Sequence, residues 1–197
     1  EEMLTNINNM VSEMKEKISK RAIVFPTGFE VKGKLIEDTN TPFLKEALEK
    51  EGFKVTVGDI IEDDIDDMVY KLDEAISRAY GIVITTGGVG AEDKDKTVEG
   101  VLKIDPEAAT PYIVKFKQGT GRHVKDGVRI AVGQIGPTFI VSMPGPNDEV
   151  QVASKVLIDC LKNNLDKQQM AQKIANALAE KLSTKKFHHD VDHHHEH

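Results

Sequence analysis

The sequence has one cysteine, no tryptophan and no long apolar run. Because a single cysteine, Cys160, cannot form an internal disulfide, the chain is compatible with a reducing compartment. No stretch of about 18 apolar residues is present, so no segment is predicted to span a membrane. The formal net charge of −7 argues against a nucleic-acid partner, whose binding surface would normally be basic. The sequence starts with Glu1 without a signal-peptide pattern, and we expect a cytoplasmic protein.

The order of strand and helix patterns predicts an α/β fold. Strands are predicted over 21–28, ended by Pro26 and Gly28, and over 53–61 and 80–88, with two further runs over 128–134 and 138–143. Helices are predicted over 3–19, 41–51 with Thr41 as N-cap, 64–79, 97–103, 147–163 and 166–183. Residues 104–126 suggest a short helix and an irregular loop. Alternating strands and helices are typical of βαβ units, so we expect a mostly parallel sheet that carries an antiparallel hairpin, covered by helices on both faces.

The predicted organisation has four parts. An N-terminal helical extension covers residues 1–20, the α/β body 21–163, a C-terminal helix 164–185 and a His-rich flexible tail 186–197. The histidines of the tail are favourable ligands for Zn²⁺ or Ni²⁺, but a tail without any role is the other interpretation. Cys160 lies on the apolar face of its helix and is predicted to be a core residue.

Four polar or glycine-rich segments follow four of the predicted strands. They are "PTGFEVKGKLIEDTN", "IEDDIDD", "TTGGVGAEDKDKT" and "MPGPND". Since ligands of open α/β sheets bind outside the carboxyl ends of the strands, we expect the four segments to converge on one crevice.

The third segment is suited to an anionic ligand. Gly87, Gly88 and Gly90 let backbone N–H groups approach an anion closely, and a helix starting at Thr97 directs its positive dipole end toward phosphate. Asp95 lies just before that helix. The alternative is a plain glycine turn, since the spacing matches neither the P-loop nor the dinucleotide Gly-x-Gly-x-x-Gly motif.

The acidic residues of the second segment have two interpretations. Carboxylates there are suitable ligands for Mg²⁺, which takes one or two of them together with substrate phosphates. They are equally suited to capping the next helix and complementing its dipole. The same ambiguity holds for Asp38 and Asn40, which either bind a ligand or shape a turn.

In combination and order, these segments resemble the MoaB/Mog (molybdopterin-binding) domain family, and most of all its branch formed by the N-terminal domain of CinA, the competence-damage-inducible protein. "TGFEVKGKLIEDTN" is similar to the opening motif of that branch, and "ITTGGVGAEDKDKT" to its Thr-Thr-Gly-Gly-x-Gly loop with a following acid and Thr. The likeness covers about residues 21 to 160.

The resemblance implies a three-layer αβα domain, commonly a homo-oligomer and often a trimer. It implies that Asp63 and Asp95 serve magnesium-dependent, or other divalent-metal-dependent, handling of a phosphate ester, as catalytic residues and metal ligands. The ligand-binding candidates are Gly28, Glu30, Gly33, Asp38, Asn40, Thr86, Gly87, Gly88, Gly90, Lys94, Thr97, Pro144, Gly145 and Pro146.

The resemblance leaves three functions open. In the CinA branch the site is associated with metal-dependent hydrolysis of a nucleotide diphosphate such as ADP-ribose. In the Mog branch it transfers an adenylyl group from ATP to molybdopterin, in molybdenum cofactor biosynthesis. Ala91 replaces the usual proline and Lys94 the usual second aspartate of the CinA branch, so a catalytically silent oligomeric binding module is the third.

Overall fold

The computed structural model describes residues 1–27, 37–62, 64–87, 91–115 and 127–192, with the backbone alone for residues 87, 91–95 and 185–192. Its centre is a sheet with the strand order β2 (Lys54–Val57), β1 (Arg21–Thr27), β3 (Ile82–Gly87), β7 (Thr138–Ser142), β6 (Val132–Ile135). The first four strands are parallel and β6 is antiparallel to β7. This arrangement confirms the predicted mostly parallel sheet with a hairpin.

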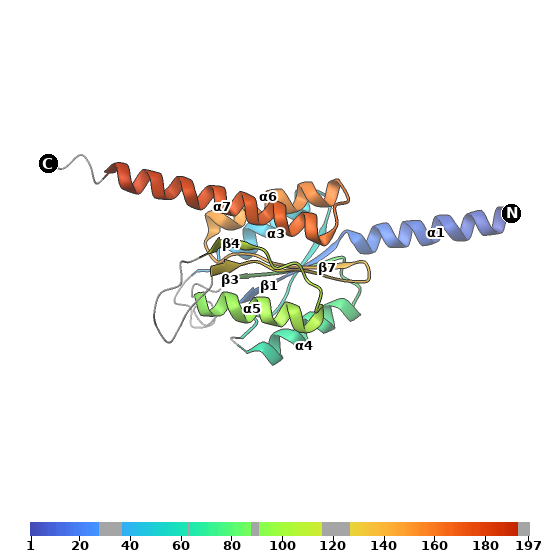
Figure 1. The fold of residues 1–197 in the computed structure, drawn as a ribbon. Helices are drawn as coiled ribbons and strands as arrows, with labels where there is room; N and C mark the ends of the chain where they lie inside the picture. The colour runs from blue at the N-terminus through green and yellow to red at the C-terminus, as the bar shows by residue number, and fades with distance from the viewer. Residues whose placement is uncertain (28–36, 63, 88–90, 116–126, 193–197) are drawn as a thin grey trace.

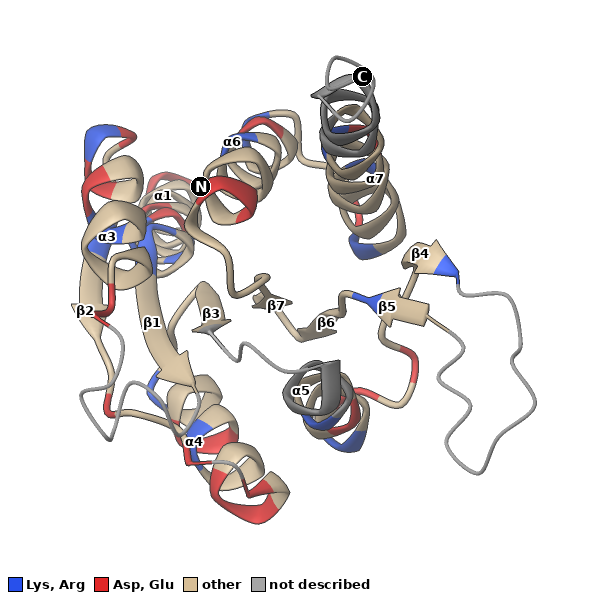
Figure 2. Ribbon diagram, turned by 90° about the vertical axis from the view of Figure 1, so that its left-hand side faces the viewer, with Lys and Arg blue, Asp and Glu red and all other residues tan. Residues whose placement is uncertain are grey.

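Helices cover both faces of the sheet and make three layers (Figure 1). On one face lie α3 (Asn40–Lys50), α6 (Asn147–Lys162) and α7 (Lys167–Asp192). On the other lie α4 (Ile65–Ser77) and α5 (Ala91–Ile104), as the view along the sheet in Figure 2 shows. None of the described helices is long and apolar enough to cross a bilayer.

The core consists of two apolar clusters separated by the sheet. Val24, Ile82 and Ile84 point toward α3, α6 and α7, whereas Ile23 and Val83 point toward α4 and α5. Each fully buried side chain of this size stabilises the fold by about 2 kcal/mol. Cys160 belongs to the first cluster and is fully buried, which confirms the core prediction; burial raises the pKa of its thiol.

The strand β1 continues through Pro26 and ends at Thr27, whereas we predicted that Pro26 and Gly28 together end it. Proline disrupts a central strand because it lacks an N–H donor. The Pro26 carbonyl accepts a hydrogen bond from Ile61 N on the side of β2, so the missing N–H faces that side too. Since β2 has already ended at Val57, the ladder loses no hydrogen bond there.

The segment around residue 112 contains a strand that the sequence interpretation missed. β4 (Tyr112–Lys115) pairs antiparallel with β5 (Gly127–Arg129) in a separate two-stranded sheet. The predicted run 128–134 is accordingly divided between β5 and β6. Tyr-Ile-Val favours a strand, but four residues are too few to predict one when the partner lies beyond an intervening segment.

The last helix is longer than predicted and is part of the core. Met170, Ile174 and Leu178 are fully buried against the sheet. We predicted that the helix ends at 185 and a flexible tail follows, but α7 continues to Asp192. A helix that is nucleated by its packed half extends at little cost, so a segment without apolar periodicity remains helical.

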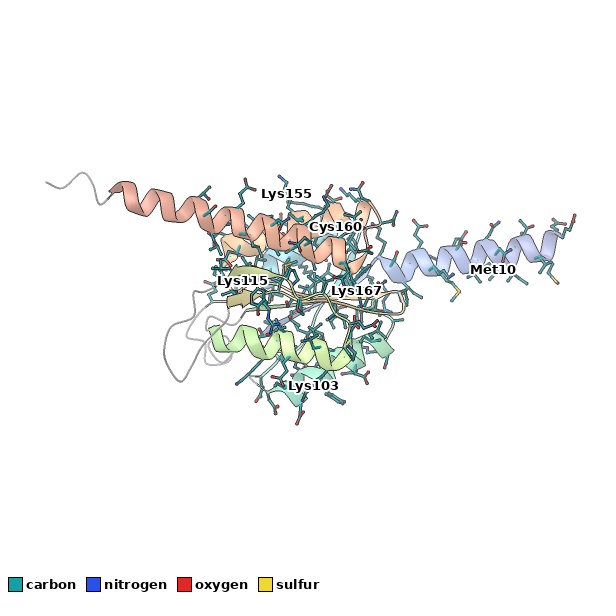
Figure 3. The ribbon with its side chains drawn as sticks, in the orientation of Figure 1. Met10, Lys103, Lys115, Lys155, Cys160 and Lys167 are labelled. Atoms are coloured by element: carbon teal, nitrogen blue, oxygen red, sulfur yellow. The ribbon has the colours of Figure 1, made fainter. Side chains whose placement is uncertain are left out.

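The first helix, α1 (Glu2–Ser19), extends away from the body and buries no residue. Its side chains, Met10 among them, surround a helix that the body does not touch along most of its length (Figure 3). Only its C-terminal end is attached: Lys20 lies 4.4 Å above the Phe53 ring, and the Arg21 guanidinium donates to the carbonyl of Arg78 at 2.7 Å. Gly81 lies directly under this junction.

Candidate functional site

The strand order places a change in the direction of the chain connections between β1 and β3. The chain leaves β1 toward α3 on one face of the sheet and leaves β3 toward α5 on the opposite face. Such a topological switch point, at the carboxyl ends of the strands, is where open α/β sheets bind ligands. Figure 2 looks onto this edge, with α3 on one side of it and α4 and α5 on the other.

Hydrogen bonds hold the strand ends together at this edge. The Thr27 hydroxyl donates to the Thr86 carbonyl at 3.4 Å, and the Thr86 hydroxyl to the Pro144 carbonyl at 3.5 Å. The Met143 N–H donates to the Thr85 carbonyl at 2.7 Å. The ends of β1, β3 and β7 therefore lie side by side, as the sequence predicted for the segments that follow them.

Asp38 starts α3. Its Oδ1 accepts hydrogen bonds from the N–H groups of Asn40 and Thr41, each at 3.1 Å. The helix thus begins at Asn40, one residue before the predicted cap Thr41, because the carboxylate satisfies the free donors of the first turn. The structure thus confirms the prediction that Asp38 shapes the turn before α3; its role toward a ligand stays a prediction.

Asn40 connects the segment after β1 to the segment after β7. Its side chain is 7% exposed; Nδ2 donates to the Gly145 carbonyl at 2.7 Å, and Oδ1 accepts from Asn147 Nδ2 at 3.0 Å. Asn147 Nδ2 also lies 3.3 Å from the Thr39 carbonyl. Since both ends of the Asn40 amide are used inside the protein, the residue positions the Pro144–Gly145–Pro146 segment.

Asn40→Ala is expected to lower the free energy of unfolding by about 2 kcal/mol, because it removes the donor of the Gly145 carbonyl and one of the two acceptors of the Asn147 amide. Urea unfolding of the two proteins measures the difference. Asn163→Ala is the matched control: Asn163 is exposed and bonds only to Asp159, so a loss of about 0.5 kcal/mol or less is expected. Equal losses for the two variants would show that the Asn40 connection does not hold the edge.

The acidic residues before and within α4 have structural roles. Asp64 is the N-cap, and its carboxylate accepts from Asp66 N at 2.9 Å. Asp67 accepts from Glu62 N at 3.0 Å and from Lys71 Nζ at 2.8 Å. The capping interpretation is therefore confirmed for Asp64, whereas Asp63 lies outside the described residues.

The helix after the glycine loop starts earlier than predicted. α5 begins at Ala91, not at Thr97, so Asp95 lies inside the helix and Thr97 in its middle. Glutamate and aspartate in the first turn favour a helix start because they complement the dipole, and residues 92 and 93 supply both. The positive end of the helix dipole thus directly follows the glycine loop, which suits an anion.

The remaining predicted residues are placed only in part. Gly28, Glu30, Gly33, Gly88 and Gly90 lie outside the described residues, and the side chains of Lys94 and Asp95 do as well. Gly87 is the last residue of β3. Among the described side chains, no group of three or more His, Cys, Asp or Glu has the arrangement of a metal site.

Two buried hydroxyls near the edge have no hydrogen-bond partner among the described residues, Thr41 Oγ1 and Thr85 Oγ1. Thr85 is 1% exposed at the end of β3 and Thr41 is 4% exposed in the first turn of α3. Buried polar groups without a partner cost free energy. The chemistry of these two hydroxyls, which can donate a hydrogen bond, fits a polar or anionic ligand at this edge.

Sequence reasoning missed one cation near the site. Arg129 lines a small pocket together with Thr97, Met143 and Pro144, and its guanidinium lies 5.5 Å from the centre of the Tyr112 ring. It brings a positive charge to a site whose predicted side chains are otherwise mainly acidic. No signal in the sequence identifies it, because its position depends on the missed pairing of β4 with β5.

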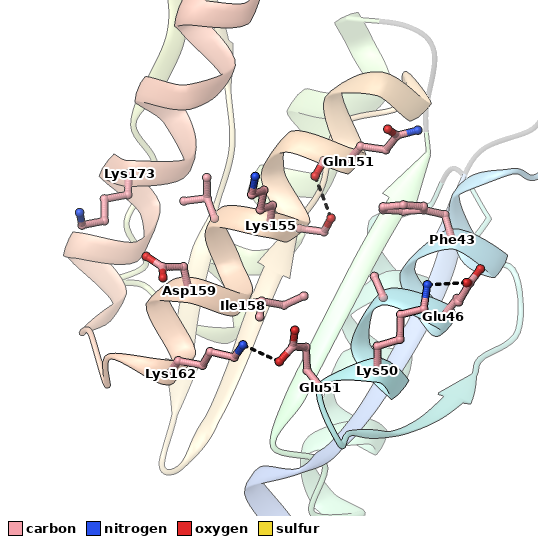
Figure 4. Close-up of a pocket in the computed structure, with 13 residues that line it drawn as sticks. Phe43, Glu46, Lys50, Glu51, Gln151, Lys155, Ile158, Asp159, Lys162 and Lys173 are labelled. Carbon is pink, nitrogen blue, oxygen red and sulfur yellow. Dashed lines mark hydrogen bonds and ion pairs between the residues drawn. The ribbon is translucent and has the colours of Figure 1, made fainter.

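A groove of about 900 Å³ lies elsewhere, between α3 and α6 (Figure 4). Its floor includes Phe43 and Ile158, and ion pairs of Lys50 with Glu46 and of Lys162 with Glu51 lie along it. None of the predicted site residues is among the described residues that line it. This groove is larger than the pocket beside Arg129, but it lies on the outer side of the helix layer. The described residues that the sequence predicts to bind a ligand lie at the sheet edge instead.

Comparison with known proteins identifies the domain. The model of the family described as "Probable molybdopterin binding domain" matches residues 23–163. A CinA-like protein of Fervidobacterium nodosum is 37% identical over 82 residues, which are 42% of this chain and 20% of the relative. One of Thermosipho melanesiensis is 30% identical over 158 residues, which cover 67% of this chain and 39% of the relative. A probable FAD synthase of Caenorhabditis briggsae is 32% identical over 121 residues, 61% of this chain and 20% of the relative.

Solved structures share the fold. The molybdopterin biosynthesis Mog protein of Mycobacterium ulcerans has a TM-score of 0.57 at 22% identity, with coverage of 77% of this chain and 99% of that chain. The CinA protein of Thermoplasma acidophilum has a TM-score of 0.54 at 18% identity, with coverage of 74% and 98%. At these identities the likeness shows the fold alone. The curated relatives above are much longer than their matched part, since the match spans 20% to 39% of their length.

Proposed function

This chain belongs to the family of probable molybdopterin binding domains, and we propose that it binds a pterin or a nucleotide diphosphate at the β1–β3 edge and hydrolyses a diphosphate with a divalent metal. ADP-ribose is the substrate that the resemblance to the CinA branch favours. The names of the CinA-like relatives support this branch of the family.

The observation that supports the proposal is that the ends of β1, β3 and β7 meet at one switch point. Asn40 and Thr86 each hydrogen-bond to the Pro144–Gly145 turn, and α5 begins directly after the glycine loop. Backbone N–H groups at a helix start are a ready-made site for phosphate. The two unpartnered threonine hydroxyls add donors for a polar ligand.

The residues of this chain have separate roles in the proposed reaction. The glycine loop and the start of α5 hold the diphosphate, Asn40 fixes the turn at Gly145, and Arg129 adds a positive charge on the wall of the site. Asp63 and Asp95 would hold the metal, which, when bound, neutralises negative charge on the phosphate in the transition state. Residue 63 and the side chain of Asp95 lie outside the part of the chain that the structure describes.

The proposed reaction is the hydrolysis of ADP-ribose to AMP and ribose 5-phosphate. A water oxygen bonds to one phosphorus, the bond from this phosphorus to the bridging oxygen breaks, and the bridging oxygen leaves with the other phosphate. The two protons of the water pass to the phosphate products and the solvent. The Asp95→Asn substitution is expected to reduce AMP formation at least about a hundredfold, since charge stabilisation at a phosphoryl group contributes several kcal/mol. AMP is measured by chromatography with Mg²⁺ or Co²⁺ present.

Glu99→Gln is the matched control, because Glu99 is an exposed acid of the same helix, and its activity is expected to equal that of the unchanged protein. A thermal shift with ADP-ribose, molybdopterin or FAD provides a readout that does not require turnover, since a ligand of the folded state raises Tm. FAD is included because relatives carry the name FAD synthase. Turnover that survives Asp95→Asn would contradict the proposed role of that residue.

Two alternatives differ in the outcome of the same experiment. A molybdopterin adenylyltransferase would form no AMP from ADP-ribose, but molybdopterin would raise its Tm. A silent binding module would show a thermal shift without turnover with any metal. A cytoplasmic location, expected from the sequence, and assembly of the body into a trimer, implied by the family resemblance, are proposals as well.

A further inference from the structure

The helix α1 carries an apolar surface that nothing in the described structure covers. The exposed fractions are 77% for Met3, 67% for Leu4, 63% for Met10 and 60% for Met14. Apart from Val57 and Tyr70, every large apolar side chain that is exposed in the described part belongs to this helix. Exposed apolar patches of this kind mark interaction surfaces.

The spacing of these residues is that of a coiled coil. Leu4, Ile7, Val11, Met14 and Ile18, the seam of α1, follow one another in alternating steps of three and four. Such a repeat of 3.5 residues favours packing against another helix with the same repeat. The seam ends at the body, where Ile18 becomes partly buried, so its first four residues are available for a partner.

The flanking residues select the direction of the pair. Beside the seam lie Glu1, Asn8 and Lys15 on one flank and Met3, Met10 and Lys17 on the other. In an antiparallel pair each flank faces the same flank of the partner helix. When Ile7 of one helix lies opposite Val11 of the other, Glu1 of one helix faces Lys15 of the other, and the two copies of Asn8 face each other. In a parallel pair the two flanks face each other and Met10 faces Lys15, without opposite charges. Charged pairs beside the seam decide partner orientation, so the antiparallel pair is favoured.

We propose that α1 is a dimerisation helix that pairs with α1 of a second copy of this chain, antiparallel and in the register that places Ile7 opposite Val11. The helix spans about 27 Å and projects from the body (Figure 1), so the two bodies lie at opposite ends of the helix pair. Residues 2–19 lie outside the family match, which begins at residue 23. The surface is therefore an addition to the family domain.

The test is the mass of the full chain in solution, measured by light scattering over about a hundredfold range of protein concentration. Ile7→Glu is expected to reduce the mass of the particle about twofold, since it breaks a two-fold pair. Asn9→Glu, on the side of α1 opposite the seam, is expected to leave the mass unchanged. Because α1 buries no residue, both variants keep a folded body, and an unchanged Tm verifies it.

Disulfide cross-linking tests the direction. Asn8→Cys is expected to form a covalent dimer on oxidation, because residue 8 meets its own copy, and Met14→Cys is not, because the two copies of residue 14 lie about 15 Å apart along the axis. The natural thiol of Cys160 is fully buried and does not interfere. Cross-linking through residue 14 alone would show a parallel pair and overturn the proposal. The proposal would also be overturned if Ile7→Glu left the mass of the particle unchanged. A twofold loss of mass without either cross-link would overturn it as well, and would indicate that α1 docks elsewhere, for example in the groove between α3 and α6.

Discussion

Asp105→Ala is expected to lower the free energy of unfolding by about 3 kcal/mol, the lower end of the range for breaking a buried ion pair. Asp105 is 5% exposed, and its Oδ2 accepts from Lys167 Nζ at 2.8 Å and from Gln134 N at 2.9 Å. Its Oδ1 accepts from Glu107 N at 3.0 Å. Alanine leaves an ammonium group and two N–H groups without their acceptor. Urea unfolding at neutral pH measures the loss.

The size of this loss is expected to depend on pH. Burial by itself raises the pKa of the Asp105 carboxyl. The hydrogen bonds from Lys167, Gln134 and Glu107 and the charge of Lys167 together outweigh burial, so the pKa lies below its ordinary value. The contribution is therefore complete above the unfolded-state pKa of about 3.9 and is lost as the pH falls through the folded-state pKa. The difference between the two proteins should be constant from about pH 7 to about pH 5 and shrink below about pH 4.

Lys162→Met is the matched control for the ion pair. Its pair with Glu51 is more exposed, with side-chain exposures of 57% and 33%, so its loss should stay below about 1 kcal/mol. If Asp105→Ala costs no more than Lys162→Met, or if its cost is the same at low pH, the network does not stabilise the fold through the carboxylate.

Gly81→Ala is expected to cost about 3 kcal/mol, because a side chain would be forced into a packed backbone. A Cβ atom at residue 81 would lie 2.6 Å from the Ile18 carbonyl oxygen and 2.6 Å from Ser19 Cα. Backbone cannot rotate away as a flexible side chain does, so the junction of α1 and β1 has to move. This movement also strains the contacts of Arg21 with the turn before Gly81.

Gly136→Ala is the comparison for Gly81→Ala. Gly136 lies in the β6–β7 turn with φ of +55° and no atom within 4 Å of the added Cβ, so only the strain of a left-handed residue, about 1 kcal/mol, is expected. Thermal or urea unfolding of both variants distinguishes the two causes. Similar losses at the two positions would mean that the junction adapts without cost.

The sheet was predictable because its strands are short apolar runs separated by clear helix patterns. Ile23, Val83 and Ile140 lie in such runs, and Gly136-Pro137 identifies the hairpin between the last two strands of the sheet. Element ends were less predictable. The N-cap of α3 is Thr39 rather than the predicted Thr41, because the Asp38 carboxylate accepts hydrogen bonds from the first turn. This start, like that of α5 at Ala91, is not determined by local propensity.

The location of the candidate site was predictable from topology, whereas its internal contacts were not. The segments around Asp38, Gly87 and Pro144 were predicted to converge because each follows a strand of the same sheet. The bonds of Asn40 to Gly145 and Asn147 join residues more than a hundred positions apart, and no pattern along the chain encodes them. Arg129 was missed for the same reason, since its place depends on the pairing of β5 with β4.

The packing of α7 means that the unit that folds is longer than the unit that defines the family. The family match ends at residue 163, yet Met170, Ala171, Ile174 and Leu178 fill the space above the sheet and are fully buried. A fragment cut at the family boundary would expose the apolar side of α6 and of the sheet beneath it, and would also lose Lys167, the partner of Asp105. Any transfer of this domain to another protein therefore has to include α7.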